Sequence, residues 1–65
     1  MFAVQSNQGY LIGYVRTTLG RVPVFDRSKG QAEVFPSRKA ATEGVAEVQE
    51  CVEQPIGGVR VVKVS

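Results

Sequence analysis

Residues 37–58, SRKAATEGVAEVQECVEQPIGG, decide the fold because they read as one amphipathic helix with a start signal and a stop signal. Ser37 belongs to the residue types that cap helix N-termini, and Pro55 followed by the glycine pair at 57–58 marks the end. Between these signals the apolar residues recur at helical spacing. They predict one buried stripe made of Ala41, Val45, Val48 and Val52.

Gly44 lies beside this stripe, inside the expected helix. A glycine there costs about 1 kcal/mol in helix propensity relative to alanine. A close approach of the helix to a sheet beneath it would explain why the position carries no side chain.

Residues 59–64, VRVVKV, follow the helix and are the strongest strand signal in the chain. Their density of valine is typical of a strand that is buried on much of both faces. We therefore expect this strand to lie in the centre of the sheet.

The N-terminal residues predict a hairpin. Residues 2–5 and 10–16 are rich in aromatic and β-branched types, and residues 6–9 between them have turn chemistry. Residues 22–25 are also apolar, but Pro23 cannot donate a ladder hydrogen bond. They are therefore limited to an edge strand or an extended loop.

Two short segments complete the expected order. Residues 26–30 predict a turn or a short helical turn, and residues 33–35 predict a brief strand that leads into the helix. The expected fold class is α+β, with a three- to four-stranded, mainly antiparallel sheet and one α-helix packed on one face. Residues 1–65 would form a single small α+β domain.

Composition restricts the class of protein. A chain of 65 residues is near the lower size limit for folding without disulfides or metals, and 43% hydrophobic residues favour a modest core over disorder. No apolar run is long enough to cross a membrane, and no signal peptide is recognisable at residues 1–5. Cys51 is the lone cysteine, which favours a reducing compartment, so we expect the cytoplasm.

The residue types needed for common catalytic sites are missing. Without histidine and with one cysteine, a single chain cannot assemble the usual zinc sites or Ser-His-Asp and Cys-His machinery. We therefore expect a protein that is not an enzyme and has no catalytic residues, no metal and no cofactor. Acidic neighbours and a position near the helix C-terminus oppose thiolate formation at Cys51, so a packed cysteine is favoured over a reactive one.

Charge is divided between two parts of the sequence. Residues 38–54 contain two cations and four glutamates and so have a net negative charge. The remaining residues have a net positive charge. Within the helix the charges oppose the macrodipole, because cations occupy the first turn and glutamates the last. One interpretation is that exposed charges are tolerated, since each costs only about 0.3–1 kcal/mol.

The other interpretation is that these charges serve a partner. The cations of the helix start and of the preceding loop could together receive an anionic group: Arg27, Lys29, Arg38 and Lys39. The acidic helix face could meet a basic surface, and it consists of Glu43, Glu47 and Glu50.

Tyr10 and Tyr14 are expected on one face of the second strand, near Arg16. If the helix leaves that face open, the two rings suit protein contact or base stacking. The alternative is that one or both tyrosines belong to the core. A single helix covers one face of a sheet, so the other face must be polar, exposed or paired in an oligomer.

Three stretches together resemble small uncharacterised proteins of phages and bacterial genomes: FAVQSNQGYLIGY at 2–14, AEVFPSRKAATEGVAEV at 32–48 and GVRVVKV at 58–64. The shared features are a Gly-Tyr hairpin, a Phe-x-Ser-basic helix entry and a valine-rich last strand. The helix entry also resembles DNA-binding domains at the N-termini of phage integrases, which generally end at the helix. The resemblance implies a β-β-α-β architecture and assigns no functional residue.

These observations lead to three hypotheses. The first is a small non-enzymatic phage or mobile-element protein that binds a host protein in the host cytoplasm. One version of this hypothesis is that binding inhibits the host protein. The second is a nucleic-acid-binding accessory protein that uses Arg16, Arg27, Lys29, Arg38 and Lys39. The third is a homodimeric structural or accessory protein joined through the uncovered sheet face. No membrane partner is expected.

Overall fold

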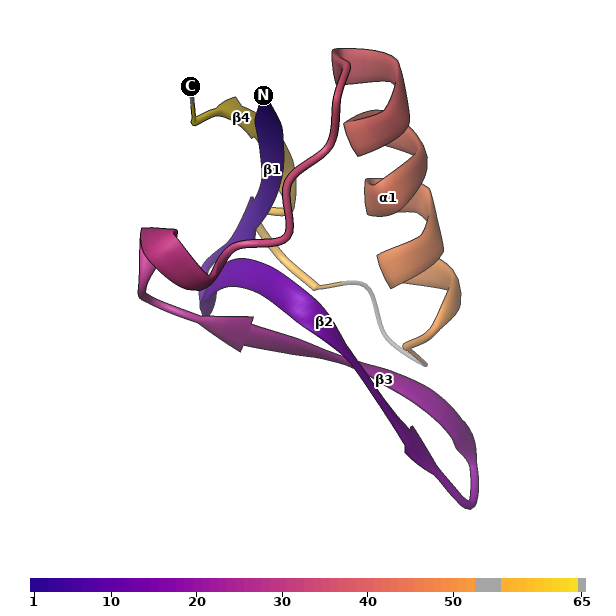
Figure 1. Cartoon of the computed structure of the whole chain (residues 1–65). Helices are drawn as coiled ribbons and strands as arrows, with labels where there is room; N and C mark the ends of the chain where they lie inside the picture. Colours follow the sequence, from indigo (N-terminus) through magenta and orange to yellow (C-terminus); the bar gives the residue numbers. More distant parts are fainter. Residues whose placement is uncertain (53–55, 65) are drawn as a thin grey trace.

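Four antiparallel strands form one sheet, and the helix packs on one of its faces (Figure 1). The computed structural model describes residues 1–52 and 56–64. The elements in these ranges are β1 (Phe2–Ser6), β2 (Gly9–Thr17), β3 (Gly20–Asp26), the 3-10 turn η1 (Lys29–Gln31), α1 (Arg38–Glu50) and β4 (Arg60–Lys63). The predicted α+β fold class is confirmed.

The strand order is β3-β2-β1-β4, so β4 lies at an edge and the prediction of a central last strand is wrong. Short hairpin turns keep β1, β2 and β3 as neighbours, which leaves the outer side of β1 for β4. Val61 pairs with Val4 and Val62 pairs with Ala3. Both valines of β4 are half-buried, although they point to opposite faces of the sheet and the helix covers only one of these faces.

Residues 22–25 lie in β3, the other edge strand. This confirms the edge-strand reading of Pro23, which sits opposite Tyr14 in the middle of the strand. An edge tolerates proline because the missing N–H is not needed by a second neighbour.

Ile12 is the extra residue of a β-bulge between β2 and β3. Side chains alternate between the two faces along a strand, so one extra residue reverses the alternation beyond it. Leu11 pairs with Phe25 and Tyr14 pairs with Pro23. Because the two β3 residues are two positions apart, Leu11 and Tyr14 lie on the same face.

Beyond the bulge, β2 and β3 leave the rest of the sheet and run beneath the C-terminal end of α1 (Figure 1). We call residues 13–24 the hairpin arm. Its turn is held by the Thr17 hydroxyl, which donates to the Gly20 carbonyl at 2.8 Å and accepts from the Leu19 N–H at 3.2 Å.

The start of α1 agrees with the sequence. The Ser37 hydroxyl oxygen accepts a hydrogen bond from the Ala40 N–H at 3.1 Å, which is the predicted N-cap. The helix ends at Glu50 with Cys51 as C-cap, several residues before the glycine pair. Pro55, the predicted stop signal, lies outside the described residues.

Val4, Leu11 and Val48 form the centre of the core, and each is at most 1% exposed. They come from β1, β2 and α1, so the core lies between the helix and the sheet. Partly buried apolar side chains surround it: Tyr14, Phe25, Phe35, Val45, Ile56 and Val59. Of the predicted stripe, Ala41 and Val48 are buried, Val45 is half-buried, and Val52 is half-buried beyond the helix end.

Gly44 marks the closest approach of α1 to the layer beneath it. A side-chain carbon added there would lie 2.9 Å from Phe35 Cζ and 3.5 Å from Val4 Cγ2. The first distance is too short for two carbon atoms. The predicted reason for this glycine is therefore confirmed.

Residues 33–35 fill the opening between β1 and β2. Phe35 forms an isolated bridge to Phe2, with backbone hydrogen bonds of 3.0 and 2.7 Å. The Glu33 N–H donates to the Leu11 carbonyl at 2.9 Å. The segment predicted as a brief strand thus ties the centre of the sheet to the start of α1.

Candidate protein-contact surface

Tyr10 and Tyr14 lie on opposite faces of the sheet, so the prediction that they share one is wrong. The cause is the bulge at Ile12, which moves Tyr14 to the face covered by the helix. Tyr14 packs against the core cluster. Tyr10 pairs with Gln5 on the other face and is half-buried.

The Tyr14 hydroxyl is buried and has no hydrogen-bond partner in residues 1–52 and 56–64. Burial raises the pKa of Tyr14 to about 12, and the nearby Glu47 and Cys51 act in the same direction. Arg21 opposes this shift, because its guanidinium carbon lies 4.8 Å from the centroid of the Tyr14 ring.

Arg21 connects the hairpin arm to the end of α1. Its guanidinium lies 2.7 Å from Glu47 Oε1 and 3.9 Å from Cys51 Sγ. The hydrogen bond to Glu47, and then the charge of that carboxylate, raise the pKa of Arg21. Both side chains of the pair are nearly half exposed, so solvent screens the attraction and it contributes little to stability. The pair joins the hairpin arm to the last turn of α1.

Arg38, one of the two cations in the first turn of α1, packs on an aromatic ring. Its guanidinium carbon lies 5.0 Å from the centroid of the Phe2 ring. Such a contact stabilises by about 0.5–1 kcal/mol at exposed sites, which matches the macrodipole cost of the charge. Glu47, near the other end, has Arg21 as partner. Two of the reversed charges thus have partners inside the molecule.

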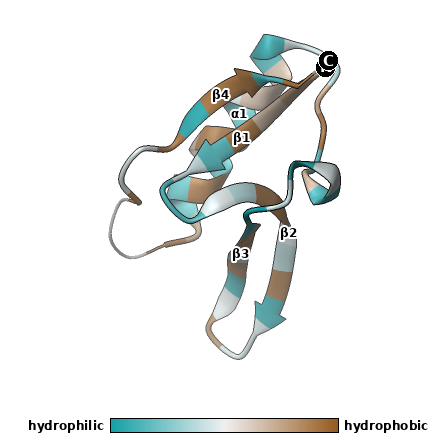
Figure 2. Cartoon of the chain, turned by 90° about the vertical axis from the view of Figure 1, so that its left-hand side faces the viewer, coloured by the Kyte–Doolittle hydropathy of each residue, from teal (hydrophilic) through white to brown (hydrophobic). Residues whose placement is uncertain are grey.

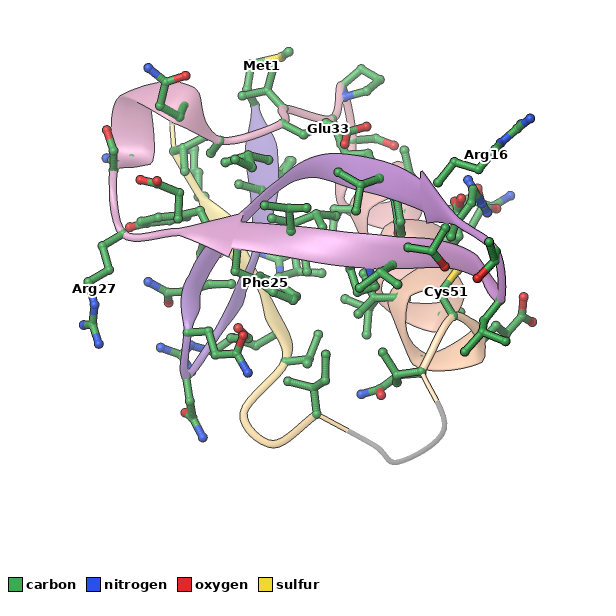
Figure 3. The ribbon with its side chains drawn as sticks, turned by 90° about the horizontal axis from the view of Figure 1, so that it is seen from below. Met1, Arg16, Phe25, Arg27, Glu33 and Cys51 are labelled. Carbon is green, nitrogen blue, oxygen red and sulfur yellow. The ribbon has the colours of Figure 1, made fainter. Side chains whose placement is uncertain are left out.

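The four cations predicted to form one anion site lie in two places. Arg27 and Lys29 precede or belong to η1, whereas Arg38 and Lys39 begin α1, and an extended segment separates the two ends (Figure 1). The fold therefore places these four cations as two pairs, one near η1 and one at the start of α1. Arg16 and Arg27 project from opposite ends of the molecule (Figure 3).

The predicted acidic face divides in a similar way. Glu43 and Glu50 are exposed, and Glu47 is half-buried in its pair with Arg21. Lys39 lies four residues before Glu43 on the same side of the helix, so it reduces the local negative charge. The helix surface is mixed rather than uniformly acidic.

Figure 2 shows the sheet face that is turned away from α1, coloured by the hydropathy of each residue. Its strand residues follow from the register and from the alternation beyond the bulge. We call it the uncovered face. It consists of Ala3, Gln5, Tyr10, Gly13, Val15, Thr17, Gly20, Val22, Val24, Asp26, Arg60 and Val62.

Most of the uncovered face is apolar or carries no side chain. Val15 and Val22 pair across the hairpin arm and are 50% and 42% exposed, and Val24 is half-buried beside them. Leu19 at the arm's turn is 95% exposed, whereas the small Ala3 in β1 is fully buried and adds no accessible surface. Exposed apolar groups gathered on one surface of a small protein typically mark a contact site.

Both edges of the sheet are poorly suited to an added strand. Pro23 removes an N–H from β3, and β4 is short and charged at both ends, with Arg60 and Lys63. These are the devices by which edge strands avoid pairing with other chains. The face, rather than an edge, is therefore the surface suited to contact.

Residues 1–52 and 56–64 contain no group of three or more Asp, Glu, Cys or His side chains that could hold a metal ion, and no pocket. In the same part of the chain, no helix combines the length and hydrophobicity that a membrane-spanning helix requires.

Val15, Val22 and Arg21 were not among the residues predicted from the sequence to contact a partner. The alternation of Val22 and Val24 indicated that both lie on one face of a strand. Because of the bulge, the sequence did not show which residues of β2 lie on the same face. Arg21 gave no signal, because its partner Glu47 is distant in the sequence.

Comparison with protein families, curated proteins and solved structures found no match to this chain.

Proposed function

We propose that this chain is a non-enzymatic binding protein that contacts another protein through the uncovered face. The observation that carries the proposal is the exposed valine pair Val15 and Val22, beside Leu19, on a surface that α1 leaves open. An apolar sheet face with blocked edges supports side-chain packing against a partner surface. The scattered cations and the mixed helix surface support it further, since neither offers a continuous charged track.

The resemblance to phage proteins makes a host protein in the cytoplasm the partner class to test first, with inhibition as the proposed consequence. The test uses Val22→Lys, which places a charge in the middle of the uncovered face. Thr42→Lys adds the same charge to the exposed side of α1 and is the matched control.

The experiment has two stages. Wild type and both variants serve as baits in a host lysate, and each recovered protein is then purified and titrated against the same three chains. A partner that binds wild type and the control with equal affinity, and Val22→Lys at least about tenfold more weakly, supports the proposal. Equal binding by all three chains, or no direct binding by any, would overturn it.

Nucleic-acid binding through Arg16, Arg27, Lys29, Arg38 and Lys39 is the alternative proposal. Arg16 and Arg27 project from opposite ends of the molecule, which gives this proposal less support (Figure 3). Its test is titration with DNA and RNA at about 50 and 200 mM salt, because phosphate contacts lose affinity steeply with salt. No binding at the lower salt concentration would end it.

A further inference from the structure

The hairpin arm is a two-stranded ribbon that is attached to the sheet at one end. Residues 13–17 pair with residues 20–24, and none of the other described strands pairs with either segment. β1 pairs with β2 at residues 9–10, before the arm begins. The position of the arm therefore depends on the joint at its base and on side chains that reach α1 (Figure 1).

The joint at the base of the arm combines a bulge with a glycine. Leu11 and Phe25 form the last pair on the body side, where Leu11 is 1% exposed and Phe25 packs against the core. Ile12 is the bulge residue, and Gly13 with Val24 is the first pair of the arm. A side-chain carbon added to Gly13 would meet no atom of the described residues within 4 Å, apart from its chain neighbours. Its φ of 154°, rather than crowding, favours glycine there, so the joint is a place where the ribbon can bend.

Arg21 makes polar contacts between the arm and the end of α1. Its guanidinium lies 2.7 Å from Glu47 Oε1 and 3.9 Å from Cys51 Sγ. The side chains of Arg21 and Glu47 are 49% and 44% exposed, and solvent screening makes ion pairs of this kind weak. These contacts therefore hold the arm against α1 only weakly.

Tyr14 lies beneath Arg21 and has two opposite effects on the position of the arm. Its ring packs against the core cluster, which favours the position seen here. Its hydroxyl is buried and has no hydrogen-bond partner within residues 1–52 and 56–64. A buried hydroxyl without a partner lacks the hydrogen bonds that water would give it. Because Tyr14 belongs to the arm, an outward movement of the arm would restore these bonds.

We propose that the hairpin arm opens away from α1 about the joint at Ile12 and Gly13, on the microsecond-to-millisecond timescale of hinge motions. The structure shows the closed position. Arg21 and the ring of Tyr14 favour this position, and hydration of the Tyr14 hydroxyl favours the open one. Because the opposing contributions are both small, the open arm is a minor state of about 1–10%, within the range in which proteins populate such states.

Opening changes the surface that a partner meets. Val15 and Val22 move with the arm, whereas Ala3 and Val62 stay with the β1–β4 half of the sheet. A partner that packs against the arm therefore selects one of its positions, and the apparent affinity falls as the other position gains population. The opening itself does not depend on the proposed function, because it is measured on the chain alone.

The experiment is amide relaxation dispersion by NMR, which measures exchange on this timescale residue by residue. In wild type, exchange should occur in residues 13–24 and at the end of α1, and not in β1 or β4. Tyr14→Phe removes the hydroxyl and keeps the ring, so the open population should fall at least about fivefold. Tyr10→Phe makes the same change on the other face of the sheet and should leave this population within about twofold of wild type.

A second variant changes the contact with α1. Glu47→Gln keeps the size of the side chain and removes the charge that Arg21 contacts, so the open population should rise about two- to fivefold. Glu43→Gln makes the same change one turn earlier, at an exposed glutamate, and should leave the population unchanged.

Three results would overturn the hinge. The first is the absence of exchange in residues 13–24 of both wild type and Glu47→Gln. The second is exchange of equal size in β1 and β4, which would assign the motion to global unfolding. The third is an open population that Tyr14→Phe increases, because the hydroxyl would then stabilise the closed arm. None of these results bears on the proposed function, whose test measures binding of a partner by Val22→Lys.

Discussion

Val4 and Val22 are both valines in strands of one antiparallel sheet, yet Val4 is fully buried and Val22 is 42% exposed. Val4 belongs to the half of the sheet under α1, where Leu11 and Val48 pack beside it. Val22 belongs to the hairpin arm, where the chain supplies a cross-strand neighbour and no covering layer.

The two regions contain similar residue types. They differ in packing, since α1 covers the side chains of the first region and no layer covers those of the second. In the helix-covered half, burial of apolar side chains stabilises the fold by about 1.5–3 kcal/mol for each large residue. In the arm the same side chains remain in contact with solvent and contribute less. Stability should therefore depend on the first region, and association on the second.

The largest expected effect tests this division directly. Leu11→Ala should destabilise the protein by about 2–5 kcal/mol, because it leaves a cavity in the core. That equals most of the stability available to a domain of this size, so the variant should be largely unfolded at about 25 °C. Val22→Ala should change stability by less than about 0.5 kcal/mol. Urea unfolding at low micromolar concentration measures both, and similar losses would contradict the division.

The second prediction concerns the closeness of α1 to the layer beneath. Gly44→Val should cost about 1–3 kcal/mol, because the new side chain meets the Phe35 ring and Val4. Ala46→Val makes a comparable change on the exposed side of the helix, where only the propensity difference of a few tenths to about 0.7 kcal/mol applies. Thermal unfolding of the two variants gives the comparison. Equal midpoints would show that the helix can move outward without cost.

A smaller effect is expected at the junction of the two regions, where Tyr14 has a pKa of about 12 in the folded state. A pKa raised by folding gives stability that is complete below the unfolded pKa of about 10 and is lost as the pH rises toward about 12. The expected loss is about 1 kcal/mol, because solvent screens part of the effect. Urea unfolding between about pH 8 and pH 12 measures it.

Tyr14→Phe keeps the ring beneath Arg21 and removes the ionisable hydroxyl, so it serves as the control for this alkaline loss. Its stability at about pH 8 should equal or exceed that of wild type, because the hydroxyl lacks a hydrogen-bond partner in the described chain. An equal alkaline loss in both proteins would assign the effect to another group.

The smallest expected effect is at the ion pair between the arm and α1. Arg21→Gln should leave global stability nearly unchanged but raise the hydrogen-exchange rates of amides in the hairpin arm relative to those of β1. Salt at about 1 M should produce the same increase in wild type, since it screens exposed charges. Glu43→Gln is the control on the same helix. Uniform exchange throughout the sheet would show that the arm has no separate mobility.

The sequence was most informative where the signals are local. The Ser37 cap and the reason for Gly44 follow from helix geometry, and both predictions were confirmed. An edge strand was one of two predictions for residues 22–25, because Pro23 lacks the N–H that a central strand would need.

Long-range features could not be predicted in this way. The position of β4 at an edge depends on which side of β1 the hairpins leave open, and valine content does not encode that. The two tyrosines were placed on one face because regular alternation was assumed through Ile12. Gly13 was the available signal, since a glycine inside a strand often accompanies a bulge. The set of residues on the uncovered face required the register of three strand pairs.

The pairing of β1 has a consequence for how the protein forms during synthesis. Its first residues bond to Phe35, and most of its length bonds to β4, which is translated after α1. The two hairpins can close early because their partners are adjacent in the chain. β1 cannot complete its ladder until the last strand has left the ribosome. Until then the newly made chain presents an open, apolar strand, so a pause in translation before residue 60 would prolong its exposure to chaperones and to aggregation.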